Sequence, residues 1–162
     1  MSGRLPAIGL ALVAPLLGAS AALAHHPRPD PTFKVILERG PCFGSCPVYT
    51  VEVDADGQVI FKGDRFVSCQ GERRWRISPA AVAKLESQVD GSGFFGFHDA
   101  YRGHVTDLPT YTVTVTRRGR TKQVVDYVGG TVGMPAEMTT LEVVIDDAAD
   151  TLRCLDPPRT AP

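Results

Sequence analysis

Residues 48–62, VYTVEVDADGQVIFK, decide the fold. From Val48 to Asp54 apolar and polar side chains alternate, which is the period of a strand with one buried face. Asp56-Gly57 follows as a strong two-residue hairpin signal, because both positions tolerate a positive φ. The chain then returns in a second strand from Val59 to Lys62. A hairpin with one buried face predicts an antiparallel sheet.

The rest of the chain repeats this pattern around two helices. Further strands are predicted at residues 33–39, 72–77, 111–116 and 123–128, which are rich in β-branched and aromatic residues. Ser78 and Pro79 suit the start of a first helix, and Gly91 suits its exit. A second helix opens at Pro135, and one face of it carries Met138, Leu141, Ile145, Ala148 and Leu152.

These elements predict an α+β fold. We expect an antiparallel sheet of about five to six strands, with two helices packed on one face. The order is strand hairpins and then a helix, twice.

The N-terminus has the three parts of a secretory signal peptide. Arg4 is followed by an apolar run and by the small-residue exit Ala22-Leu23-Ala24. The apolar run is shorter than the roughly 20 residues that a membrane span needs. We therefore expect a signal peptide at 1–24, a Pro-rich leader at 25–32, a single α+β domain at 33–154 and a disordered tail at 155–162. The mature protein is expected to be periplasmic or secreted, without a stable membrane anchor.

The charge of the chain is balanced, with 17 Lys and Arg against 18 Asp and Glu. Nucleic-acid binders carry a strong basic excess, so this class of partner is disfavoured. Arg117, Arg118, Arg120 and Lys122 gather at a predicted hairpin tip, and Arg74 and Arg76 lie on another strand. Such basic residues either bind an anionic partner or protect exposed edge strands against aggregation.

Four cysteines in an exported chain indicate two disulfides. Cys42 and Cys46 can bond only if the intervening residues reverse the chain, because extended residues four apart are roughly 13 Å apart. Gly44 permits the reversal. We favour Cys42–Cys46 with Cys69–Cys154, among the three pairings that four cysteines allow.

The same Cys-x-x-x-Cys-Pro spacing supports a different chemistry. Thiolates at Cys42 and Cys46 would suit cuprous copper or disulfide exchange, with His98 or His104 as a further ligand. The motif leads into a strand, however, and no helix N-terminus is predicted there to lower a thiol pKa.

The long connection at 91–107 is a second candidate for function, because connections of this length are uncommon without a role. Its polar side chains could bind a metal or transfer a proton: His98, Asp99, Tyr101, His104 and Asp107. Against this, none of them shows the ligand spacing of known zinc motifs. Nearby phenylalanines would simply anchor the loop to the core.

Cys42-Phe43-Gly44-Ser45-Cys46-Pro47-Val48-Tyr49, the Asp56-Gly57 turn and Thr106-Asp107-Leu108-Pro109-Thr110 together resemble a family of bacterial exported domains of unknown function. The resemblance covers Phe33 to Leu152. It maps the family's paired cysteines onto Cys42 and Cys46, and its aromatic onto Tyr49, while Cys69 and Cys154 lie outside the signature. It implies no reaction.

The sequence thus predicts an exported, disulfide-stabilised binding or interaction module with no cofactor and no catalytic residues. Its partner would be a protein or a small ligand. The alternatives are a copper-binding or redox protein using Cys42 and Cys46, and an inhibitor of an envelope enzyme.

Overall fold

The structure is a computed structural model that describes residues 30–155. The predicted signal peptide, most of the Pro-rich leader and nearly all of the predicted tail lie outside the described residues. Asp30 and Thr32, at the end of the leader, contact the turn at residues 118–119. The Arg118 amide donates to the Asp30 carboxylate, and the Gly119 amide donates to the Thr32 hydroxyl at 3.0 Å.

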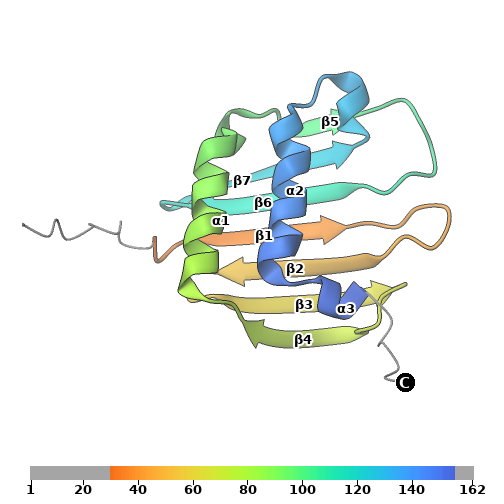
Figure 1. Cartoon of the computed structure of the whole chain (residues 1–162). Helices are drawn as coiled ribbons and strands as arrows, with labels where there is room; N and C mark the ends of the chain where they lie inside the picture. The colour runs from red at the N-terminus through yellow and green to blue at the C-terminus, as the bar shows by residue number, and fades with distance from the viewer. Residues whose placement is uncertain (1–29, 156–162) are drawn as a thin grey trace, which may run out of the picture.

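One seven-stranded sheet forms the body of the domain, in the order β4-β3-β2-β1-β6-β7-β5. Its strands are β1 (Lys34–Arg39), β2 (Val48–Asp54), β3 (Gln58–Arg65), β4 (Gly71–Arg76), β5 (Ala100–Arg102), β6 (Tyr111–Arg117) and β7 (Arg120–Tyr127). Two long helices, α1 (Pro79–Ser92) and α2 (Ala136–Ala149), cross the same face of the sheet (Figure 1). Three single-turn helices complete the chain: η1 (Phe94–Gly96), η2 (Gly129–Val132) and α3 (Leu152–Leu155).

The α+β class is confirmed, but the predicted number of strands was too low. The additional strand is β5, which lies within the connection that the sequence presented as a loop. It has three residues and pairs in parallel with β7 at the edge of an otherwise antiparallel sheet. So short a segment has no periodicity to detect, and its pairing depends on a distant strand.

The hairpin at residues 48–62 forms as its alternation predicts. Val51 lies opposite Phe61, and both are fully buried beneath the helices. Gly57 alone takes a positive φ, of 74°, so the turn does not need one at Asp56. The Asp54 carboxylate accepts hydrogen bonds from the backbone amides of Asp56 and Gln58, and these bonds hold the turn closed.

The first long helix ends later than its sequence signals suggested, and the second ends earlier. The first begins with the predicted cap, in which the Ala81 amide donates to the Ser78 hydroxyl. Its last residue is Ser92, and Gly93 forms the exit in place of Gly91. The second stops at Ala149, because Asp150 adopts a left-handed conformation with a φ of 56°. Leu152, predicted on its buried face, therefore lies in α3 and is 60% exposed.

Three loops meet at one end of the sheet, which we call the loop end: residues 40–47, 66–70 and 103–110. The chain leaves β1 and β3 there and enters β2, β4 and β6, on the right in Figure 1. Helix α2 crosses the sheet near this end, so side chains on its inner face can reach the loop end.

Candidate functional site

A disulfide between Cys42 and Cys46, the pair favoured from the sequence, closes the loop between β1 and β2. Their Cα atoms are 5.8 Å apart, so the chain reverses within this short ring. Gly44 makes the reversal with a φ of 152°, which other residues rarely adopt. Phe43 is 89% exposed. The ring therefore presents an aromatic side chain on a covalently closed support.

A second loop lies directly against this ring. The Phe43 amide donates to the Asp107 carbonyl at 3.0 Å, and the Gly40 amide donates to the Thr110 carbonyl at 2.8 Å. A Cβ at Gly40 would come within 2.9 Å of that Thr110 oxygen, so this approach requires glycine. Residues 42–49 and 106–110, which carry the family resemblance, therefore form one surface.

Beneath these loops, Asp146 of α2 joins the ends of two strands. The Arg39 guanidinium donates to one carboxylate oxygen through Nε at 2.8 Å and lies 2.7 Å from it through Nη2. The Tyr49 hydroxyl donates to the other oxygen at 2.7 Å, and the Thr151 hydroxyl does so at 3.0 Å. Burial and the neighbouring Asp146 charge raise the pKa of Tyr49, which keeps the phenol protonated. This network fixes α2 to the start of β2.

An open hollow of about 270 Å³ lies between the network and the loops. The Arg39 guanidinium stacks 4.2 Å above the centroid of the Tyr111 ring and forms part of its wall. Aromatic, proline and sulfur-bearing side chains dominate the lining, which consists of Arg39, Cys46, Pro47, Tyr49, Pro109, Tyr111, Asp146 and Leu155. We call this the loop-end hollow.

A pair of buried carboxyl groups lies one helical turn away from Asp146. Glu142 on α2 is 2% exposed, and it interacts with Asp126 of β7, which is 8% exposed. Burial, followed by the charge of Asp126, raises the pKa of Glu142 to about 8, although Arg39 opposes the shift. The Gly129 amide donates to the Asp126 carboxylate at 2.6 Å. The raised pKa favours the protonated, uncharged form of Glu142, which reduces the cost of burying it.

The chemistry of the hollow follows from how its polar atoms are used. Asp146 accepts from Arg39, Tyr49 and Thr151, so its charge is already compensated within the protein. The rest of the lining is largely apolar and includes Pro47, Pro109 and Leu155. Such a surface suits an aromatic, proline or aliphatic group better than an isolated ion.

The residues predicted in the long connection have separate local roles. The His98 amide donates to the Tyr101 hydroxyl at 3.0 Å, and the Tyr101 ring is buried. Asp99 pairs with Lys122 at 2.6 Å, and this hydrogen bond lowers the pKa of Asp99. His104 is exposed. Only Asp107 contacts the cysteine ring, and it does so through its carbonyl.

The thiol and copper hypothesis finds no ligand set in residues 30–155. Cys42 and Cys46 are bonded to each other, so neither is a thiolate in this structure. Within this described range, no group of three or more His, Cys, Asp or Glu side chains is placed to hold a metal ion.

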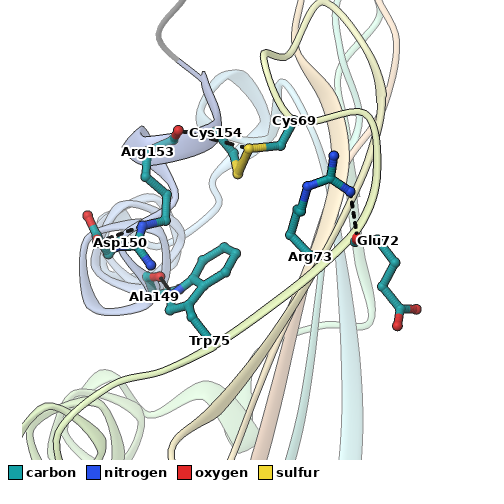
Figure 2. The surroundings of a disulfide bond; sticks show 8 residues. All are labelled: Cys69, Glu72, Arg73, Trp75, Ala149, Asp150, Arg153 and Cys154. Atoms are coloured by element: carbon teal, nitrogen blue, oxygen red, sulfur yellow. Dashed lines mark hydrogen bonds and ion pairs between the residues drawn. A yellow bond between two sulfur atoms is a disulfide. The ribbon is translucent and has the colours of Figure 1, made fainter. Parts of the chain in front are cut away.

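The second disulfide joins Cys69, in the loop before β4, to Cys154 of α3 (Figure 2). Beside it, the Trp75 indole donates to the Ala149 carbonyl at the end of α2, at 2.8 Å. Arg153 stacks on the same ring at 5.0 Å. The indole thus ties the last turn of α2 to the outer strand β4, and the disulfide ties α3 to the loop that precedes this strand.

The motifs singled out in the sequence include Cys46, Tyr49 and Pro109, which line the hollow, but not Arg39, Tyr111 or Asp146. Arg39, Tyr111 and Asp146 come from three elements that meet only after folding. One signal was available: Glu142 and Asp146 are four residues apart, next to the apolar positions Leu141 and Ile145 of the second helix. Acidic residues beside the buried face of a helix predict a paired or protonated carboxyl group.

The fold and these contacts define a small α+β domain whose loops are held by two disulfides. The family described as "Domain of unknown function (DUF6438)" matches residues 33–149. The chain belongs to this family. No curated protein matches the chain.

The two disulfides indicate an oxidising, non-cytoplasmic setting. In the part of the chain that the structure describes, none of the helices has the length and apolarity needed to span a membrane.

Proposed function

We propose that this domain is an exported binding module that recognises an apolar or aromatic segment of a partner protein at its loop end. The observation that carries the proposal is Phe43, 89% exposed on a disulfide-closed ring. At this exposure the phenylalanine ring leaves a large apolar surface in water and adds nothing to the core. Aromatic anchors on rigid supports are typical of interaction sites.

The surroundings of Phe43 support the same function. Leu108 is 47% exposed and follows Asp107, whose carbonyl accepts the Phe43 amide. Pro109, the next residue, lines the loop-end hollow. Phe43 and Leu108 can therefore contact a partner while an apolar side chain of that partner enters the hollow.

The ring is also rigid enough to bind without a large loss of entropy. The Cys42–Cys46 disulfide closes it, and the Phe43 and Gly40 amides attach it to the neighbouring loop. Binding then requires little ordering of the backbone, which is the cost that weakens recognition by mobile loops.

Chemical cross-linking in an envelope extract of the native cell tests this function. The purified wild-type protein is compared with Phe43→Ser and with Val143→Ser, a matched control that removes a 51% exposed apolar side chain from the outer face of α2. We expect the cross-linked partner to disappear with Phe43→Ser and to persist with Val143→Ser. Equal capture by all three proteins, or equal loss in both variants, would refute recognition at the loop end.

A further inference from the structure

The two edge strands of the sheet differ in length. One edge is β5, which has only three residues, and short edge strands offer little template for pairing. The other edge is β4, which has six residues and pairs on one side with β3. In the described chain no strand lies on its outer side. The sheet thus has one long open edge.

The open edge is rich in arginine. Three of the six residues of β4 are Arg73, Arg74 and Arg76, against one acidic residue, Glu72. Arg74 lies 2.6 Å from the Glu72 carboxylate, whereas Arg73 and Arg76 donate to the backbone carbonyls of Glu72 and Asp56. The chain as a whole has a net charge of −1, so this edge is locally basic in a neutral protein.

The arginines project from both faces of the strand. Arg73 lies opposite Phe61, whose side chain is buried beneath the helices, so Arg73 shares the helix face. Arg74 and Arg76 lie opposite Ile60 and Gln58, on the open face. A strand added outside β4 would therefore meet a guanidinium group on either side.

The edge is held in an extended form before any partner arrives. The Cys69–Cys154 disulfide anchors the chain just before β4, and the Ser68 amide donates to the Cys154 carbonyl at 2.8 Å. Within the strand, the Trp75 indole donates a hydrogen bond to the Ala149 carbonyl (Figure 2). A preformed strand loses little conformational freedom when another strand is added.

We propose that β4 binds an extended acidic segment of a partner protein as an additional strand. Backbone hydrogen bonds would supply the pairing, and carboxylates at alternate positions would meet Arg74 and Arg76 on the open face. A carboxylate at an intervening position would meet Arg73 on the helix face. A second copy of the chain does not fit, because pairing β4 with itself places arginines against arginines. Lysine side chains would be sufficient to protect an edge strand against aggregation. This strand instead carries three arginines, whose planar guanidinium groups are suited to binding carboxylates.

Trp75 gives a direct readout, because it is the single tryptophan of the chain and lies within β4. The probe is a blocked eight-residue peptide that alternates glutamate and threonine, titrated against the full mature protein at low ionic strength. We expect a saturable change in Trp75 emission and slower amide exchange across β4. The corresponding lysine–threonine peptide should produce neither.

Two comparisons separate strand addition from simple charge attraction. A glutamate–proline peptide of equal charge cannot form a ladder, and we expect it to bind at least tenfold more weakly to the wild-type protein. The double variant Arg74→Glu/Arg76→Glu should weaken the glutamate–threonine peptide at least tenfold. Lys84→Glu/Arg118→Glu, with the same change in charge on exposed residues elsewhere, should remain within twofold of wild type.

The proposal is overturned if the glutamate–threonine peptide does not bind, if the proline peptide binds equally well, or if both double variants lose affinity alike. Phe43→Ser should bind the acidic peptide as the wild type does. Binding at the loop end and binding at the β4 edge are therefore tested independently.

Discussion

Gly44 sets the geometry of the Cys42–Cys46 ring at the scale of a single residue. Its φ of 152° is the conformation that lets the chain reverse, and a Cβ there would find open space, with only the Cys42 sulfur, at 3.8 Å, nearby. The requirement for glycine at this position is therefore one of backbone conformation and not of packing.

Gly44→Ala should lower the free energy of unfolding by about 1–3 kcal/mol, because alanine is strained at this φ. The measurement is urea denaturation of the oxidised protein. Gly91→Ala is the matched control: Gly91 lies inside α1 with open space around it, so alanine should stabilise the protein by up to about 1 kcal/mol. Equal effects in the two variants would show that the ring does not depend on Gly44.

Tyr49→Phe should cost about 1.5–3 kcal/mol of stability, since it removes a part-buried hydrogen bond to the charged Asp146. Thermal or urea unfolding measures the loss. Tyr127→Phe removes an exposed hydroxyl that donates to the Val105 carbonyl and should cost at most about 0.5 kcal/mol. A Tyr49→Phe variant as stable as Tyr127→Phe would contradict the role given to Asp146.

Sequence reasoning at this scale succeeded where the constraint is local. The reversal at Gly44 follows from the distance that a disulfide must span. The pairing of Arg39 with Asp146 joins residues 107 positions apart, and no local pattern indicates it.

At the scale of elements, α2 connects the buried carboxyl pair to the loop end. Glu142 faces Asp126 from β7, the Arg39 charge from β1 and Asp146 on its own helix. Glu142 and Asp146 therefore lie at positions of α2 where strands β7 and β1 supply charged side chains.

The raised pKa of Glu142 makes stability depend on pH. Glu142 keeps its proton in the folded protein up to about pH 8, whereas its ordinary pKa is 4.5. The folded state thus binds an extra proton between these values, and the free energy of unfolding should fall as the pH rises from 4.5 to 8. The slope from this one group is at most about 1.4 kcal/mol per pH unit. Urea unfolding across this range measures it.

Glu142→Gln should remove this slope, because an amide does not titrate. Glu137→Gln, an exposed change on the same helix, should leave it in place. A wild-type protein whose stability rises from pH 5 to 8, or a slope that survives Glu142→Gln, would disprove a buried protonated Glu142.

Elements with a strong periodic signal were predictable and those without were not. The hairpin at residues 48–62 and both helices formed where alternation, caps and apolar faces indicated them. Strand β5 has three residues and a parallel partner, and α2 ends at a left-handed Asp150 that no glycine marks.

For the whole molecule, the two disulfides act over very different lengths of chain. Cys42–Cys46 closes a separation of 4 residues. Cys69–Cys154 closes one of 85 and joins the loop before the outer strand to the last helix. The short ring shapes a surface, and the long bridge restricts the unfolded chain.

Cys69→Ala/Cys154→Ala should therefore cost about 4–5 kcal/mol, and Cys42→Ala/Cys46→Ala about 2 kcal/mol, in the chain-entropy description of disulfides. Denaturant midpoints of the two double variants test the difference. A short-ring variant that is the less stable of the two would contradict this division of roles.

The most direct test of recognition at the loop end is the affinity for the partner captured by cross-linking. Titration of that partner by calorimetry should give a dissociation constant at least tenfold higher for Phe43→Ser than for wild type, and within twofold of wild type for Val143→Ser. Equal affinity of Phe43→Ser and wild type would show that Phe43 and its ring are not the binding site.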